Sequence, residues 1–167
     1  MTQWHIAQLN VATARYDLED PQMHGFMSQL DDVHALADSS SGFVWRLQSE
    51  SGNATDIQVQ DDPRLIVNMS VWESVDALFD FAYRSAHRQV LTRRREWFTR
   101  PEGPYQVLWW VTSGHQPTVE EGMERLKRLA KDGPTAHAFS FKSSFPPPSE
   151  SGDAVDLDPA PYCAGWD

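Results

Sequence analysis

The sequence predicts an α+β domain in which a four-stranded antiparallel sheet carries helices on one face. Three observations predict it. Four segments alternate apolar and polar residues with the period of a strand, two longer segments repeat apolar residues every three or four positions, and their order is strand, helix, strand, strand, helix, strand. That order is the split βαβ unit of ferredoxin-like domains.

The first strand and the first helix open the unit. Residues 4–12 form the strand, because Ile and Val alternate there with polar residues. Asp20 is a suitable N-cap and Pro21 suits the first helical position, so a helix is predicted to start at this pair. Its apolar stripe continues to about Ala37, where we expect the helix to end.

Two strands follow the first helix. Residues 42–48 and 65–72 are rich in β-branched and aromatic side chains, which favour strands. The segment between them, 49–63, is polar and contains many turn residues. We interpret it as a long hairpin connection or as one that includes a short edge strand.

A second, longer helix is predicted to begin after Trp72 and to run to about Phe98. Acidic residues in its first turn, such as Asp76, suit the positive end of a helix. If the helix were straight, Arg93 would return to its apolar face. We therefore expect a bend near Ser85.

The fourth strand and the C-terminal elements complete the chain. The strand is predicted at 105–112, and an appended helix begins at a capping box that starts with Thr118. Residues 138–145 have the alternation of a fifth strand, and 146–167 form an acidic, proline-rich arm. The chain is thus one domain, 1–145, followed by a C-terminal arm.

Charge and composition restrict the classes of function. The net charge is −10 and the pI is about 4.9, so nucleic acid is not an expected partner, because binding phosphates requires a dominant basic surface. No apolar stretch reaches the roughly 20 residues that span a bilayer, and the first residues lack signal-peptide features. We expect a cytoplasmic protein with no membrane partner. The single cysteine, Cys163, cannot form an internal disulfide.

Strand alternation separates the two faces of the predicted sheet. The odd-numbered residues are almost all apolar, so we expect the two helices to pack on that face. The even-numbered residues mix aromatic and aliphatic side chains with several amides and Arg46. Buried amides cost on the order of 1–3 kcal/mol each unless they are paired. A partly apolar surface with a few hydrogen-bonding groups is typical of a ligand cavity, so we predict one on this face.

A second copy of the chain is the expected cover for the even-numbered face. No second domain is available to cover it, so we predict a homodimer in which two subunits share the pocket. The alternative is a wet, polar dimer interface without a ligand. Arg46 matters in either case, because a guanidinium in such surroundings favours a carboxylate or phosphate partner.

The helix segment 81–98 adds further candidate groups to the pocket. It holds five of the eleven arginines of this acidic chain. His87 and Arg94 lie at the edge of its apolar face, beyond Tyr83 along the helix. His87 is either a packed structural histidine or an imidazole presented to the pocket. In the second case it could bind a metal or haem iron, or move a proton near neutral pH.

Several runs of residues resemble an uncharacterised bacterial family, a domain of unknown function. They are HIAQLN in the first strand, GFVWRLQ in the second, LIVNMSVWES at the entry to the long helix, and YRSAH and RRREWF within it. The resemblance covers about residues 4–142. More remotely, the chain is similar to the dimeric α/β-barrel superfamily, which includes antibiotic-biosynthesis monooxygenases and haem-degrading oxygenases and pairs two ferredoxin-like sheets face to face.

The haem-degrading branch of that superfamily supplies residue-level expectations. It has an Asn in the first strand, a Trp-Glu-Ser entry to the second main helix, and a helical His that binds iron. Asn10, Trp72-Glu73-Ser74 and His87 match this outline, and Phe81 stands near the position of a helical Trp. The resemblance implies that, if haem binds, His87 is its metal ligand and Arg46 meets a propionate.

We therefore expect a monooxygenase-like enzyme that acts on a small aromatic or polycyclic molecule, either without a cofactor or with haem. In the cofactor-free form, His87 would move a proton. The alternatives are a non-catalytic protein that binds a small, haem-like molecule and a dimeric scaffold without a ligand. The candidate catalytic residues are His87 and Asn10, the cofactor-binding residues are His87 and Arg46, and the substrate-binding residues are Asn10, Arg46, Asn68, Trp72, Phe81, Tyr83 and Trp110.

Overall fold

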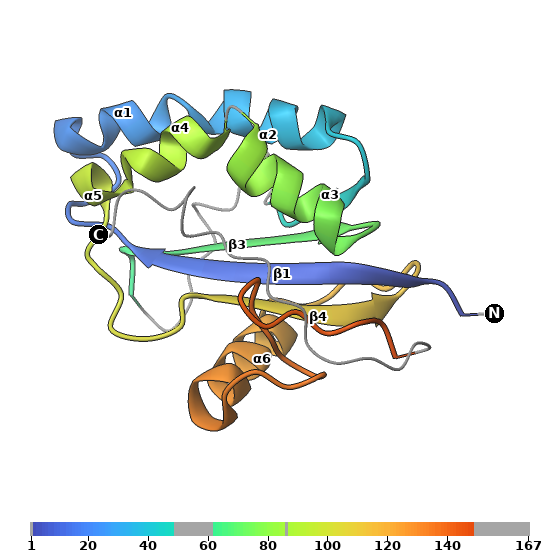
Figure 1. The fold of residues 1–167 in the computed structure, drawn as a ribbon. Helices are drawn as coiled ribbons and strands as arrows, with labels where there is room; N and C mark the ends of the chain where they lie inside the picture. Colours follow the sequence, from blue (N-terminus) through green and yellow to red (C-terminus); the bar gives the residue numbers. More distant parts are fainter. Residues whose placement is uncertain (1, 49–61, 86, 149–167) are drawn as a thin grey trace.

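The computed structural model describes residues 2–48, 62–85 and 87–148. Within them, an antiparallel sheet lies between two layers of helices (Figure 1). The strands are β1 (Trp4–Thr13), β2 (Phe43–Arg46), β3 (Leu65–Trp72) and β4 (Gln106–Thr112). They pair in the order β2-β3-β1-β4, and every pairing is antiparallel. The predicted α+β class and the four predicted strands are confirmed.

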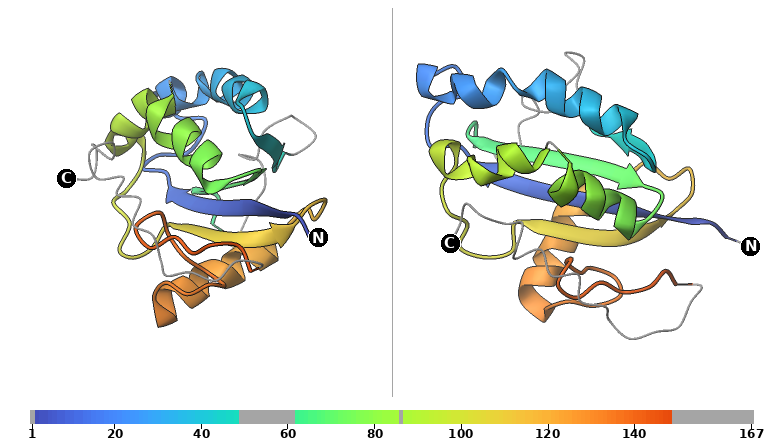
Figure 2. Two further views of the ribbon diagram at one scale, coloured as in Figure 1. Left: turned by 45° about the vertical axis from the view of Figure 1, so that its right-hand side comes forward. Right: turned by 45° about the horizontal axis from the view of Figure 1, so that its top comes forward.

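The helices lie in two groups. Between β1 and β2 are η1 (Pro21–Met23), α1 (His24–Met27) and α2 (Leu30–Ser39). Between β3 and β4 are α3 (Val75–Phe79), η2 (Asp80–Arg84), α4 (His87–Thr92) and α5 (Arg94–Trp97), and α6 (Val119–Asp132) follows β4. Figure 2 shows from two further directions that α1 to α5 stay on one face of the sheet and α6 on the other.

Side-chain caps mark the two helix starts that the sequence predicts most clearly. The Asp20 carboxylate accepts a hydrogen bond from the backbone N–H of Gln22, and Pro21 takes the first position of η1. The Thr118 hydroxyl accepts one from the backbone N–H of Glu121 at the start of α6. Both starts are confirmed, although the predicted first helix is divided into η1, α1 and α2.

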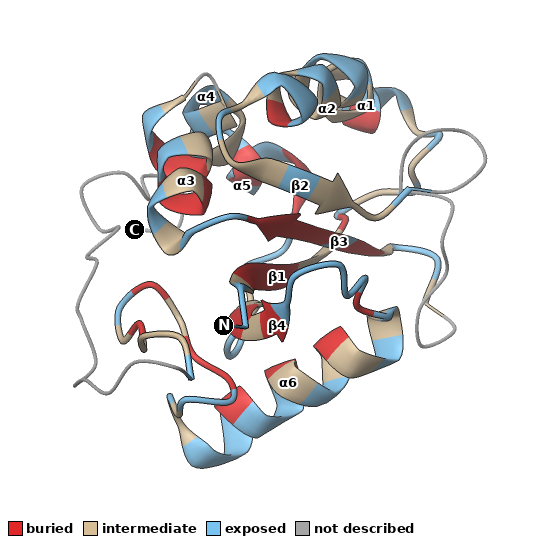
Figure 3. Ribbon diagram, turned by 90° about the vertical axis from the view of Figure 1, so that its right-hand side faces the viewer, coloured by how far each residue is buried: buried red, intermediate tan, exposed pale blue. Residues whose placement is uncertain are grey.

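The two faces of the sheet are used in the opposite way from the prediction. Odd-numbered residues such as Leu9 and Trp109 pack with Leu126 and Leu129 of α6, rather than with the helices between the strands. In Figure 3 the buried residues of α6 face the sheet and its exposed residues face away. The alternation separated the faces correctly, but both were apolar enough to be covered, so it could not say which helices would cover each one.

The location of α6 removes the reason given for the homodimer. That reason was a sheet face with no cover from its own chain, whereas here helices of one chain cover both faces. Among the described residues, Val44 is the only large apolar side chain that is exposed. The homodimer and the face-to-face barrel stay predictions, and a second copy would have to contact some other surface.

The predicted long helix is interrupted near Ser85, where a bend was expected. The π-helical turn η2 follows α3, and Ser85 is extended, with φ −100° and ψ −177°. Its hydroxyl donates to the carbonyl of Phe81 and accepts from the backbone N–H of His87 at 3.1 Å. Serine competes in this way for backbone groups that a continuous helix would use. The interruption makes His87 the first residue of a new helix.

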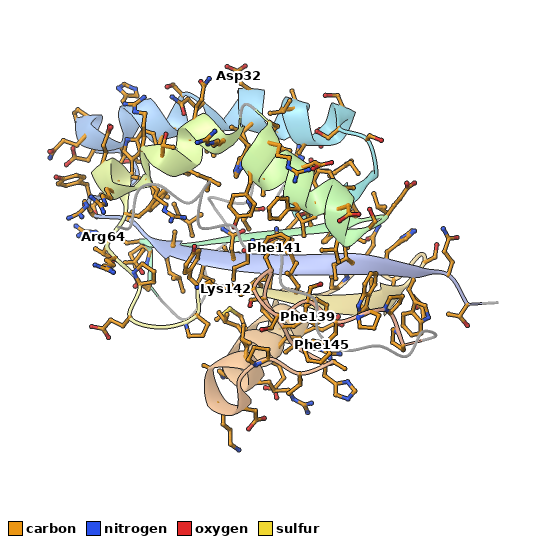
Figure 4. All side chains as sticks on the ribbon, in the orientation of Figure 1. Asp32, Arg64, Phe139, Phe141, Lys142 and Phe145 are labelled. Carbon is orange, nitrogen blue, oxygen red and sulfur yellow. The ribbon has the colours of Figure 1, made fainter. Side chains whose placement is uncertain are left out.

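The segment predicted as a fifth strand forms only isolated bridges. Phe139 exchanges two backbone hydrogen bonds with Leu108 of β4, at 2.8 and 2.9 Å, but no ladder extends from this pair. Phe139, Phe141 and Phe145 lie close to β1 and β4 in Figure 4, with Lys142 beside them. The arm from 149 onward, with Cys163, lies outside the described residues, and so does most of the 49–63 connection.

None of the helices in the described part of the chain combines the length and the apolar character needed to cross a membrane.

Candidate functional site

A cavity of about 270 Å³, partly open to solvent, lies over the even-numbered face of the sheet, and a single chain forms its walls. It occupies the end of the sheet where β1 finishes and β3 begins. Its walls come from helices in the β1–β2 connection, from helices in the β3–β4 connection and from the loop before β4. The described lining residues are 10–13, Phe26, Gln29, Leu30, Val33, His34, 66–68, His87, Val90, Leu91, Arg94, Phe98, Thr99 and 101–105.

His87 is held in this wall by two contacts. Its Nδ1 lies 3.1 Å from the carbonyl oxygen of Ala82, and its ring stacks on Phe81 with centroids 4.8 Å apart. A carbonyl only accepts, so Nδ1 carries the hydrogen and Nε2 carries a lone pair. No described residue hydrogen-bonds to Nε2. The imidazole is therefore fixed at one nitrogen and available at the other.

The protonation of His87 follows from its surroundings. Burial lowers the pKa of His87 below its usual range, and the hydrogen bond to Ala82 offsets only part of that shift. The ring is therefore neutral at neutral pH. A neutral imidazole with a free Nε2 is a proton acceptor, which is the state that a general base requires.

This lowered pKa predicts how stability depends on pH. The unfolded chain binds a proton at His87 near pH 6.5, but the folded chain does so only at lower pH. The free energy of unfolding should therefore fall as the pH drops below about 6.5, until the folded-state pKa is passed. Urea unfolding between about pH 7.5 and about pH 5 should show a larger fall for the wild type than for His87→Gln.

His34 is the control built into that experiment. Burial, and secondarily the charge of Arg46, lower the pKa of His34, so it contributes a fall of the same sign in both proteins. The difference between the proteins isolates His87, because glutamine does not titrate but can still donate to Ala82. Parallel pH profiles would contradict the lowered pKa of His87.

Two amides lie beside the histidine wall. Asn10 of β1 pairs in register with Asn68 of β3, and both line the cavity. Both can donate to an oxygen atom of a ligand. Gln8 and Ser70 also lie on the even-numbered face, but they hydrogen-bond to each other. The Gln8 side-chain amide donates to the Ser70 hydroxyl at 2.9 Å within the sheet.

Arg94 is a cavity residue that the sequence analysis placed at the helix edge but did not select. Its side chain is only 7 % exposed, and Nη1 donates to the hydroxyl of Tyr105 at 3.3 Å. Both residues line the cavity. The available signal was its position on the same edge as His87, about three turns beyond Tyr83. Choosing it over its neighbours would have required the location of the helix break.

Arg46 lies outside the cavity lining. Its Nε donates to the Asp38 carboxylate of α2 at 2.8 Å, and Nη2 reaches the same carboxylate at 3.4 Å. The expected carboxylate partner of Arg46 is therefore supplied by the same chain. The wall residues do not include it.

The predicted aromatic residues are packed away from the cavity lining. Phe81 lies between Trp72 and His87, stacking on both at centroid distances of 5.0 and 4.8 Å. The Trp72 indole donates to Ser70, and Tyr83 packs on Phe79 and Phe141. The Trp110 indole donates to the Phe145 carbonyl at 2.9 Å. Of the predicted site residues, the cavity thus brings together Asn10, Asn68 and His87.

The residues present do not fit haem. Pockets for drug-sized ligands measure about 300–1,000 Å³, and haem is larger than most such ligands, whereas this cavity measures about 270 Å³. Arg46 is paired with Asp38 and does not line the cavity, so it is not placed to meet a propionate.

Comparison with known families gives one match. The model of a family described as "Domain of unknown function (DUF3291)" matches residues 5–154. The matched region includes every described helix, nearly all of β1, the other three strands and all of the described cavity lining. Neither a curated protein nor a solved structure matches the chain.

Proposed function

We propose that this chain, which belongs to the DUF3291 family, is a monooxygenase-like enzyme that removes a proton from a small aromatic molecule held in the cavity. The observation that carries the proposal is the state of His87. Its Nδ1 is bound to Ala82, its pKa is lowered, and its Nε2 has no described protein partner at the wall of the cavity.

The size of the cavity supports a small ligand. A cavity of about 150 Å³ binds benzene, and the cavity here measures about 270 Å³. Its apolar walls, which include Phe26, Val90 and Phe98, suit an aromatic ring. We infer that the ligand has one or two rings.

We assign a step to three of the polar wall residues, His87, Asn10 and Asn68. Nε2 of His87 takes a proton from an O–H group of the substrate, and the Asn10 and Asn68 amides hydrogen-bond to the oxyanion that forms. The electron-rich anion then reacts with O₂. One oxygen atom of O₂ replaces two hydrogen atoms of the substrate, and the other oxygen atom leaves as water. The substrate itself supplies the two electrons that reduce this second oxygen atom, so no redox cofactor is required.

We also propose a more specific description of the fold. We infer a ferredoxin-like arrangement, which the strand order β2-β3-β1-β4 and the helical connections after β1 and β3 support. A dimer of this unit remains proposed.

A test of the function uses 1-naphthol, which would be oxidised by O₂ to 1,4-naphthoquinone and water. We expect the wild type to consume O₂ in the presence of 1-naphthol. His87→Gln should bind 1-naphthol but consume O₂ at least tenfold more slowly, because a missing general base costs about 100-fold or more in rate. His24→Gln is the matched control, since His24 is exposed and does not line the cavity.

The outcomes separate the alternatives. Equal O₂ uptake by the wild type and His87→Gln would remove His87 from the reaction. Binding of 1-naphthol without O₂ uptake would favour a protein that sequesters its ligand. A Soret band on addition of hemin that disappears in His87→Ala would instead restore haem binding.

A further inference from the structure

Tyr105 lines the cavity and is held by contacts on two sides. It belongs to the loop that precedes β4. Its backbone carbonyl accepts a hydrogen bond from the Val11 N–H of β1 at 2.9 Å. Its hydroxyl oxygen lies 3.3 Å from Nη1 of Arg94, and the Arg94 Cζ lies 5.7 Å from the centroid of its ring. Tyr105 is therefore tied to both β1 and α5.

The pair with Arg94 leaves the hydroxyl hydrogen of Tyr105 unused. A guanidinium only donates hydrogen bonds, so the Tyr105 oxygen is the acceptor in this pair. A hydroxyl that accepts one hydrogen bond can still donate another, and the bond that it accepts polarises it as a donor. No described residue accepts the hydrogen of the Tyr105 hydroxyl. This hydrogen is available to a ligand in the cavity.

Tyr105 and His87 lie at different places along the cavity wall. Arg94, which contacts the Tyr105 hydroxyl, follows His87 by seven positions, through α4 and into α5. A helix rises about 1.5 Å per residue, so these two backbone positions lie about 10 Å apart. A hydrogen bond joins heavy atoms that are only about 3 Å apart. We therefore expect the ligand oxygen that meets His87 to be different from the oxygen that meets Tyr105.

We propose that Tyr105 is a further ligand-binding residue and that its hydroxyl donates to a second, uncharged oxygen of the ligand. This inference rests on the proposed function, because it uses the same cavity and a substrate whose O–H group meets His87. A neutral O–H donor requires only an acceptor, so a carbonyl oxygen is sufficient and the ligand needs no charge. The ligand is then an aromatic molecule with a phenolic O–H group at one end and a carbonyl oxygen at the other.

The test compares two probes of nearly the same shape, 6-acetyl-2-naphthol and 6-isopropenyl-2-naphthol. The second probe carries a CH₂ group where the first carries its carbonyl oxygen. Isothermal titration calorimetry in the absence of O₂ measures binding without turnover. Tyr105→Phe should weaken binding of the acetyl probe by about 3- to 10-fold, as expected for the loss of one neutral hydrogen bond. Its affinity for the isopropenyl probe should stay within about twofold of that of the wild type.

Tyr16→Phe is the matched control, since Tyr16 is also half-buried but does not line the cavity. Its affinities for the two probes should equal those of the wild type. Infrared spectroscopy of the bound acetyl probe gives a second measurement. Because a hydrogen bond weakens the C=O bond, the carbonyl stretch should lie at a lower frequency in the wild type than in Tyr105→Phe.

The outcomes separate this inference from the proposed function. If Tyr105→Phe weakens both probes equally or weakens neither, or if the wild type binds 1-naphthol but not the acetyl probe, the inference fails. Oxidation of 1-naphthol that depends on His87 would leave the proposed function standing, because 1-naphthol has no second oxygen. If the wild type binds none of the three molecules, both fail. Should Tyr105→Phe not fold, the wild type decides: a bound carbonyl frequency equal to that of the probe in an apolar solvent would overturn the inference, and a lower one would support it.

Discussion

Replacing Phe139 with alanine is expected to lower the free energy of unfolding by about 3–5 kcal/mol. Phe139 has no exposed surface and packs in a cluster with Ile6, Phe79 and Leu108, which come from two strands and α3. Its ring lies 5.7 Å from that of Phe145. The small residue would leave a cavity that the paired backbone at Leu108 prevents from collapsing. Urea unfolding followed by circular dichroism measures the loss.

Lys142→Ala is the control for this change. Lys142 is exposed on the same segment, three residues away (Figure 4), so its replacement should alter the free energy of unfolding by no more than about 0.5 kcal/mol. A similarly small effect of Phe139→Ala would mean that this segment detaches without disturbing the sheet. The segment would then be an extension of the C-terminal arm and not part of the domain.

Local sequence signals predicted the elements well, because each is decided by neighbours along the chain. The alternation of β1 and β3 and the caps at Asp20 and Thr118 involve residues only a few positions apart. The bend at Ser85 was also local, since one hydroxyl competes for nearby backbone groups. The cover of each sheet face was not local. It depends on whether α6 or the earlier helices pack on a given face, and both are amphipathic.

The predicted site residues lie at two different positions along the length of the sheet. Antiparallel register places Ile6 opposite Trp72 at one end of the β1/β3 pair and Asn10 opposite Asn68 in its other half, which ends with Thr13 opposite Leu65. The half with Asn10 faces the cavity, whereas α3 and the segment around Phe139 cover the end with Ile6. The alternation of odd- and even-numbered residues predicted the correct face for all of these residues. It carried no information on position along the strand, so it selected Trp72 and Trp110, which do not line the cavity, together with Asn10 and Asn68, which do.

Arg46 and Arg94 illustrate the same limit for charges. Arg46 was expected on the mixed, even-numbered face of the sheet and was selected for the site, whereas Arg94 was expected at the edge of the apolar helix face and was not selected. Asp38 lies on α2 where it can pair with Arg46, a contact that exists only once α2 packs on β2. Arg94 reaches the cavity because the helix is interrupted at Arg93. Partner choice for a guanidinium is thus set by tertiary packing, which a single sequence does not specify.

Replacing Gly122 with valine is expected to lower the free energy of unfolding by about 2–3 kcal/mol through overpacking. Gly122 brings α6 close to β1, and a Cβ atom there would lie 2.5 Å from Cδ1 and 3.2 Å from Cβ of Leu9. Leu9 is fully buried, so its side chain has no free space to enter. A helical glycine normally costs about 1 kcal/mol relative to alanine, so the loss would reverse the usual propensity effect.

Leu9→Ala supplies the partner of Gly122→Val in a double-mutant cycle. Alone, Leu9→Ala should cost about 2–5 kcal/mol because it leaves a cavity. Together, the two changes exchange three carbon atoms across the same contact and conserve its volume, so their combined loss should be smaller than the sum of the single losses by at least about 1 kcal/mol. Gly25→Ala is the control, since its Cβ would meet the Trp97 ring no closer than 3.4 Å. Additive losses would mean that α6 does not rest on β1 through this glycine, and the covered odd-numbered face would then need another explanation.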